Sequence, residues 1–470
     1  MTIIFRIGLL IWMAFWHNFF DFQGKTKETF QNLSSDIFTL SLEDAVNMAV
    51  QANRTLASAD DNVTQSRLYL AQTKSDFEIK IVPEADFSQF FQNGSFALGV
   101  SMAKKFPTGT EFVLSPVMEK IGGRRTSGMQ LTLTQPLLRG LKPLYNLAGV
   151  KTSEYQVRTS QRNLFLTQVS VILLTINSVY EIIRNREILN LQTSSFERFK
   201  GYLESAIVKQ KAGIATALDV YRAKIKMNLV ESLVISSRES YQDSVDNLKM
   251  LLAIPLEKDI AVTAPLLYDL LVVDEDSAIE SALKTRVELD QLRDMKEIYQ
   301  LHAEATRHSF LPTLNLVVKY STLPDFPAEN NSKSENIEFG LSAGGDIRRS
   351  VERAEYEIDL LAIKGIDRQM NLRMDDIKKD VKVALRNLRR AEKYIEIQNE
   401  QVKQSKGKLE LSKIKFSHGY ADNFDILEAE TELRQAEVDL ITASIGYITG
   451  IYQFKAATGS LVEYESISPK

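Results

Sequence analysis

The sequence predicts a mainly α-helical protein with some β-strands, built as two structural repeats. The first observation is an internal repeat: KAGIATALDVYRA at 211–223 recurs 206 residues later as SHGYADNFDILEA at 417–429. The second is a helical pattern before each copy that is too long for an ordinary globular domain. The third is a segment with partial two-residue alternation, punctuated by Gly and Pro, ahead of each long helix. Each half therefore reads as helix, strand pair, very long helix, glycine turn and returning helix.

The two copies match at the positions that shape a helical hairpin. The matching pairs are Gly213 and Gly419, Ala215 and Ala421, Asp219 and Asp425, and Ala223 and Ala429. Glycine adopts a left-handed turn at little cost, so each copy predicts a hairpin with Gly at its tip. Each Asp then lies in the first turns of the returning helix, where the helix dipole favours a carboxylate.

The composition excludes several classes of function. The net charge is -4 over 470 residues and charges of both signs are interspersed, which argues against a nucleic-acid partner. The absence of Cys and the presence of only four His exclude thiol chemistry and most zinc sites. The sequence has no nucleotide-binding loop and no nucleophile motif. We therefore expect no catalytic residue, metal site or cofactor, and the protein is not predicted to be an enzyme.

The N-terminal segment, residues 1–24, is predicted to be a signal peptide. Arg6 precedes an apolar run from Ile7 to Phe20, which is shorter than the roughly 20 residues of a membrane-spanning helix. No clean A-x-A motif marks a cleavage site, so the mature start stays open, with an uncleaved anchor as the alternative. No later stretch is predicted to be a membrane helix, so strands would have to carry the protein into a membrane.

The first repeat is assigned to residues 25–254. A helix is predicted from Ser41, with Asp44 forming an approximate capping box, towards Phe77 and an end at Pro83. Strands follow at about 83–138 and a long helix at 141–212. This long helix carries an apolar seam of the kind found in packed helix pairs: Ile172, Ile176, Val179 and Ile183.

A connector at 255–275 leads to the second repeat, residues 276–458, and a C-terminal tail at 459–470. The second repeat is predicted to hold a helix, strands at about 312–345 and a long helix at 349–418. Its seam is more regular than the first: Ile377, Val381, Ala384, Leu388, Ala391 and Ile395.

The sequence resembles the TolC-like outer-membrane efflux protein family (outer membrane factors) over nearly its whole length after the leader. The likeness rests on the helix ends Ile81-Val82-Pro83 and Phe310-Leu311-Pro312, the strand TLTQPLLRG at 132–140, and the two G-x5-D hairpins followed by Ala. It implies a homotrimer in the outer membrane of a Gram-negative-type cell. Strands of three chains would close one β-barrel through the lipid, and the long helical coiled coils would form a periplasmic tunnel.

The function that the resemblance implies is the outer-membrane channel of a tripartite efflux or type I secretion system. Its partners would be a periplasmic adaptor (membrane fusion) protein and an inner-membrane pump of the RND, ABC or a similar class. The resemblance also implies adaptor docking at the two hairpin tips, which comprise Lys211, Ala212, Gly213, Ile214, Ser417, His418, Gly419 and Tyr420.

The resemblance further implies a periplasmic gate made by Asp425 and Glu428, with Asp219 and Phe416 nearby. Asp425 and Glu428 are three residues apart and share one helix face, with Phe424 and Leu427 expected on the packed side. The alternative is that this acidic face is simply solvated. Phe416 stands where the family usually has Tyr, and Ala421 where it usually has Arg, so closure is expected to rest more on packing than on ionic links.

Two questions stay open at this point. The extra hairpin around Pro107 to Gly109 could enlarge the barrel or lie outside it. The alternative function is an envelope structural coiled-coil protein without transport activity, which would leave matching strand pairs in both halves unexplained.

Overall fold

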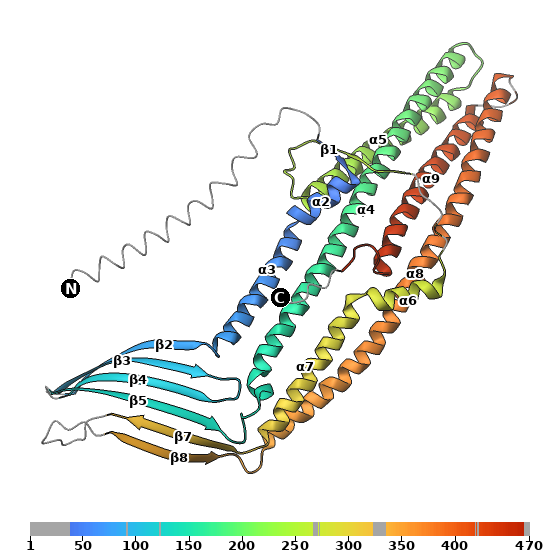
Figure 1. Ribbon diagram of the computed structural model, residues 1–470. Helices are drawn as coiled ribbons and strands as arrows, with labels where there is room; N and C mark the ends of the chain where they lie inside the picture. The colour runs from blue at the N-terminus through green and yellow to red at the C-terminus, as the bar shows by residue number, and fades with distance from the viewer. Residues whose placement is uncertain are drawn as a thin grey trace.

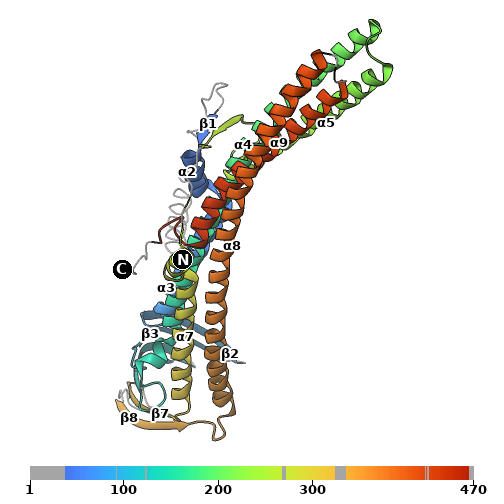
Figure 2. The same cartoon turned by 90° about the vertical axis from the view of Figure 1, so that its right-hand side faces the viewer.

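The computed structural model describes residues 38–90, 93–121, 124–266, 271, 273–322, 335–418, 420 and 423–464. The predicted signal peptide at 1–24, and Gly419 and Ala421 of the second tip, lie outside the described residues. The molecule is elongated, with a β-sheet at one end and long helices that run to two tips at the other (Figure 1). Seen from the side, the helices bend towards the tips (Figure 2). The predicted fold class, mainly α with antiparallel strands in two repeats, is confirmed.

The helices of the described chain fall into two matching sets. The first set comprises α2 (Leu42–Ala52), α3 (Arg54–Ser75), α4 (Pro143–Lys211) and α5 (Ala217–Leu251). The second set comprises α6 (Glu275–Thr285), α7 (Val287–Ser309), α8 (Ser350–Ser417) and α9 (Asn423–Ala457). The long helices α4 and α8 have 69 and 68 residues, and both returning helices have 35. Because α9 begins and ends 206 residues after α5, the sequence repeat is also a structural repeat.

The apolar seams of the two long helices are buried as their periodicity predicts. Val179 and Ile183 of α4 lie in a core cluster with Leu248 of α5. Ile377 and Val381 of α8 lie in a second cluster, which includes Tyr447 of α9. Each long helix therefore packs against its own returning helix, and the two pairs run side by side (Figure 1).

Three local features differ from the sequence prediction. The helix that was predicted to end at Pro83 ends at Ser75, and Pro83 lies inside strand β2. The predicted single helix from Ser41 is divided at Asn53, whose side-chain oxygen accepts hydrogen bonds from Thr55 N and Leu56 N and so caps a new helix. The capping box of Ser41 and Asp44 is present. The predicted connector contains strand β6 (Ile260–Thr263), which pairs in parallel with β1 (Phe38–Ser41).

The other six described strands form one antiparallel sheet. They are β2 (Ile79–Phe90), β3 (Asn93–Lys105), β4 (Glu111–Ile121), β5 (Arg124–Pro136), β7 (Thr313–Ser321) and β8 (Asn336–Gly344). Their order in the sheet is β2-β3-β4-β5-β7-β8, so strands of both repeats join at β5 and β7. The hairpin of β3 and β4 is the extra hairpin of the first repeat, and it lies inside this sheet.

By length and composition, α4 contains a window apolar enough to cross a membrane, which the sequence prediction did not include. Nearly half of that window, 44%, is buried inside the molecule. Buried residues of α4 such as Ile176, Val179 and Ile183 lie in one core cluster with residues of α2, α5, β6 and α9, so core packing accounts for much of the hydrophobicity of this segment.

Candidate functional site: the two hairpin tips

The first tip joins α4 to α5 through a glycine in the left-handed conformation. Gly213 has φ +73°, and its N–H donates to Gln210 O at 3.0 Å. The N–H of Ile214 donates to Lys209 O at 2.9 Å, so the last carbonyls of α4 are satisfied by the turn. The side chain of Ile214 is 77% exposed at the end of the molecule.

Asp219, which was predicted as part of the gate, belongs to the capping box of α5. Its Oδ2 accepts hydrogen bonds from Thr216 N at 2.9 Å and Thr216 Oγ1 at 2.7 Å. These bonds favour the charged form, and they lower the pKa of the Asp219 carboxyl below its usual range. The structure therefore gives Asp219 a role in starting the returning helix.

The second tip joins α8 to α9, and its described part resembles the first. The N–H of Tyr420 donates to Lys415 O at 2.9 Å, while Ser417 Oγ and the His418 ring both contact Ile414 O. The Tyr420 side chain is 85% exposed. Both tips therefore present a large apolar or aromatic side chain on a short, hydrogen-bonded turn.

Phe416, at the end of α8, contacts the other hairpin. The Lys209 ammonium of α4 lies 3.4 Å from the centroid of its ring, a cation–π contact between the two hairpins. The ring also packs against the buried cluster that contains Ile426 and Ala429 of α9. Phe416 is thus part of the packing at the tip.

Asp425 and Glu428 lie together on the exposed face of α9, while Leu427 is buried on the opposite side. Their charged surroundings include Lys408 of α8, whose Nζ lies 2.8 Å from both carboxylate oxygens of Glu432. The hydrogen bond and charge of Glu432, with the charges of Glu428 and Asp425, raise the pKa of Lys408. One face of the second hairpin therefore carries three carboxylates and one ammonium.

Phe424 differs from its predicted place on the packed side. Its side chain is 42% exposed, and the Arg222 guanidinium of α5 lies 5.2 Å from its ring centroid. The contact links the two returning helices, which explains why an aromatic residue occupies a partly exposed position.

A buried charged cluster behind the tips was not predicted from the sequence. Glu430 of α9 is fully buried, and its carboxylate accepts a hydrogen bond from Arg198 Nε and another from Tyr202 Oη at 3.3 Å. Burial, with the Glu430 carboxylate beside it, raises the pKa of the Tyr202 hydroxyl to about 12. One turn further along α9, the buried Arg434 donates to Gln192 Oε1 at 3.3 Å. The signal in the sequence is a Glu and an Arg, four residues apart, at seam positions of α9 that apolar residues would usually occupy.

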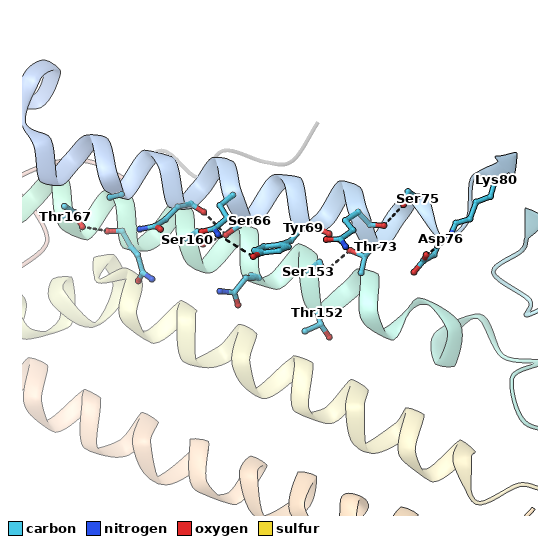
Figure 3. A pocket seen from close by; sticks show the side chains of 16 residues that line it. Ser66, Tyr69, Thr73, Ser75, Asp76, Lys80, Thr152, Ser153, Ser160 and Thr167 are labelled. Atoms are coloured by element: carbon cyan, nitrogen blue, oxygen red, sulfur yellow. Dashed lines mark hydrogen bonds and ion pairs between the residues drawn. The ribbon is translucent and has the colours of Figure 1, made fainter. Parts of the chain in front are cut away.

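A polar cavity of about 1070 Å³ lies between α3 and α4, on the sheet side of the helices. Its walls are mostly Ser, Thr, Asn and Gln side chains, with Ser66 Oγ 2.7 Å from Ser160 Oγ and Thr73 Oγ1 3.0 Å from Ser153 Oγ (Figure 3). The charged residues of this lining, Asp76 and Lys80, form an ion pair of 2.7 Å. Such a lining suits a hydrated wall and contains no paired nucleophile and base among the described residues. Within the described ranges, no three His, Asp or Glu side chains gather as ligands for a metal ion.

Comparison with known sequences shows which proteins this chain resembles. Residues 278–460, most of the second repeat, match the model of the family described as outer membrane efflux protein. The chain is 22% identical over 371 residues to the outer membrane protein TolC of Salmonella enteritidis, covering 74% of this chain and 72% of TolC. It is 19% identical over 360 residues to TolC of Escherichia coli K12, covering 72% and 70%.

Comparison with solved structures extends the likeness over most of the fold. The outer-membrane channel OprN superimposes with a TM-score of 0.70 at 14% identity, covering 89% of this chain and 90% of OprN. The Campylobacter jejuni CmeC outer membrane channel gives a TM-score of 0.69 at 16% identity, covering 90% and 86%. With two repeats, long paired helices and an antiparallel sheet, the chain has the fold of these outer-membrane channels, and most of its second repeat matches the family of outer membrane efflux proteins.

Proposed function

We propose that this outer membrane protein is the passive exit duct of a tripartite efflux or type I secretion system. It would act as a homotrimer with a periplasmic adaptor protein and an inner-membrane pump of the RND, ABC or a similar class. Substrates would enter at the tips, pass along a tunnel lined by the helices, and leave through the barrel in the lipid. The chain itself would do no chemistry.

The open edges of the subunit carry this proposal. The sheet ends on one side at β2 and on the other at β8, with no described strand beyond either. The helices next to these two edge strands are α3, which leads into β2, and α8, which follows β8 (Figure 1). Unpaired strand edges in lipid are costly, since no water is present to satisfy their N–H and C=O groups. A closed ring of identical subunits removes both edges at once.

The tips are the proposed contact with the adaptor. The two tips lie at the end of the molecule farthest from the sheet (Figure 1). The residues proposed to contact the adaptor are Lys211, Ala212, Gly213 and Ile214 at the first tip, and Ser417, His418, Gly419 and Tyr420 at the second. A contact with the ends of two short turns buries little area, so we expect modest affinity for each subunit. Ile214 and Tyr420 are the apolar anchors that such a contact would cover.

The acidic face of α9 is the proposed gate. If three subunits bring Asp425 and Glu428 towards a common axis, six carboxylates meet at the entrance and attract cations. Lys408 offsets part of this charge, because it lies on the same face with Glu432. Phe416 supports the closed entrance through its packing, and Asp219 does so through the cap of α5.

Single-channel recording in planar bilayers tests the gate. The variant Asp425→Ala plus Glu428→Ala is expected to lose most of the cation preference and most of the block by trivalent cations. The matched control is Glu396→Ala plus Glu400→Ala, which removes the same charge from an exposed face of α8 away from the tip. The proposed gate is wrong if selectivity and block are unchanged in the first variant, or if both variants change them equally.

A further inference from the structure

We propose that the extra hairpin of β3 and β4 lies within the membrane wall, so that three subunits form a barrel of 18 strands. This inference rests on the proposed trimer, since each subunit contributes the six strands of one sheet. Two strand pairs per subunit, as the two repeats alone would require, would give a barrel of about 12 strands and a narrower exit.

The first argument is the chemistry of one sheet face. The strand registers place one residue from each strand in a row across the sheet, and every member is apolar or aromatic: Ile81, Met102, Leu114, Leu131, Tyr320 and Ile337. Met102 and Leu114, which belong to the extra hairpin, continue the apolar row without a break. Met118 of β4 is 67% exposed and Phe339 of β8 is 76% exposed on this same face, so the subunit itself does not cover it. A continuous exposed apolar face across six strands is what a lipid-facing wall requires.

The second argument is the opposite face, where the residues are polar or smaller than those of the apolar face. A neighbouring row holds Lys80, Ala103, Val113, Thr132, Lys319 and Glu338. Between β2 and β3, Ser101 Oγ on this face lies 3.0 Å from Glu84 Oε1. At the extra hairpin this face holds Ser101, Ala103, Val113 and Ser115, while the larger apolar residues Met102, Leu114 and Met118 lie on the other face. A hairpin that lay outside the barrel, in water, would not need one face with larger apolar residues than the other.

The third argument is the turn of the hairpin, which is fixed to the junction of sheet and helices. Asn146 Nδ2 of α4 donates to Pro107 O at 2.9 Å and to Gly140 O at 2.6 Å, while Thr110 Oγ1 donates to Gln135 Oε1 at 2.6 Å. Gly109 has φ +78°, and a Cβ there would overlap the Gly140 carbonyl oxygen. The turn is therefore held in place by hydrogen bonds and close packing at the start of α4.

The circumference expected for the ring of helices agrees with that of an 18-stranded barrel. Four helices per subunit, α3, α4, α7 and α8, are each adjacent in the chain to a strand of the sheet, and they run up to it (Figure 1). Twelve helices spaced by about 8–10 Å give a ring roughly 100–120 Å around. Eighteen strands spaced by about 4.8 Å and tilted by about 40° give a ring of roughly 113 Å, whereas 12 strands give roughly 75 Å. The extra hairpin therefore lets the barrel continue the helical tunnel with little narrowing, which leaves the tips as the narrowest part.

Cysteine labelling tests the position of the hairpin, because the chain has no Cys of its own. Leu98→Cys and Met118→Cys probe the apolar face, and Ala97→Cys and Ser115→Cys probe the polar face. Phe339→Cys and Ser342→Cys on β8 are the matched references for the two faces. Each variant is labelled with a fluorescent maleimide and reconstituted in liposomes. We expect nitroxide lipids to quench the first pair as they quench Phe339→Cys, and iodide to quench the second pair as it quenches Ser342→Cys.

The outcomes separate this inference from the proposed function. Native mass measurement in detergent shows whether the parent is a trimer, and a monomer would overturn the duct itself. A trimer in which iodide quenches all four hairpin probes would overturn only the 18-stranded barrel.

A second variant replaces 91–123 by a short loop that joins β2 to β5. The radius of the largest neutral polymer that can enter the channel from the outer side should then fall by about one third. An unchanged radius contradicts the inference. If this variant fails to insert, the labelling result decides.

Discussion

Glu430 is the residue whose surroundings predict the largest effect on stability. Its carboxylate is fully buried between α9 and α4, and Arg198 is the cation that pairs with it. Removing one partner of a fully buried pair costs about 3–5 kcal/mol. Because the Arg198 side chain is 37% exposed, its removal should cost less than this. We expect Arg198→Ala to lower the thermal midpoint for loss of helical circular dichroism in the detergent-solubilised protein. Glu430→Gln should lower it less, because the amide keeps a hydrogen-bond acceptor without a buried charge.

The control for this prediction is the exposed pair of Lys408 and Glu432, whose side chains are 46% and 42% exposed. Pairs in water contribute about 0–1 kcal/mol, so Lys408→Ala should leave the midpoint nearly unchanged. Equal effects of Arg198→Ala and Lys408→Ala would show that the buried pair does not join the two hairpins as the contacts suggest.

The hairpin turn between α4 and α5 gives a prediction about docking. Gly213 has φ +73°, and beyond its chain neighbours no atom lies within 4 Å of the position that a Cβ would take. A β-branched residue there therefore strains the backbone without colliding with a neighbour. The double variant Gly213→Val plus Gly419→Val should reshape the two tips and abolish export, while trimers remain intact. Export is read as the tolerance of the host cell to toxic compounds, and trimers by their mass in detergent.

Gly201→Val is the matched control, because Gly201 lies inside α4 and, beyond the backbone of its own helix, nothing lies within 4 Å of the position that a Cβ would take. This variant should export normally, because Val is at least as favourable as Gly in a helix interior. Normal tolerance in cells whose intact trimers carry both tip substitutions would contradict docking at these turns.

The elements that the sequence predicts well are those with a local cause. The 206-residue repeat locates both long helices and the glycine turn at Gly213, because helix periodicity and a left-handed glycine are properties of neighbouring residues. The parallel pair of β1 and β6 was missed since each strand has four residues and its partner lies more than 200 residues away. The place of the extra hairpin stayed open for a similar reason: only the register from β2 to β8 reveals a continuous apolar face.

The candidate site shows the same division. The exposed acids Asp425 and Glu428 follow from helix spacing, as does the burial of Leu427. Glu430 could not be assigned to the core from its own neighbourhood, because its burial depends on Arg198, which lies 232 residues away in the chain. Long-range pairing of charged groups is thus the part of the site that required the structure.

The shape of the whole subunit predicts where neighbouring subunits meet. Helix α3 packs on α4, and α7 packs on both α4 and α8, which leaves α3 and α8 at the two sides of the helix row (Figure 1). On α8, Ile358, Leu361 and Leu372 share one face and are each more than 60% exposed. Such a stripe is too apolar to remain in water, and burying each side chain contributes about 1.5–3 kcal/mol. We infer that it packs against α3 of the next subunit.

The variant Ile358→Glu plus Leu372→Glu tests this contact, because it brings two carboxylates into the predicted interface, where burial without a partner is costly. Native mass in detergent should change from trimer to monomer, while circular dichroism keeps its helical signal. Lys364→Glu plus Lys378→Glu is the control, since it also adds two acids to exposed positions of α8 but outside the stripe. It should remain a trimer. If the first variant is also a trimer, the stripe lies away from the subunit contact and the ring must close through other surfaces.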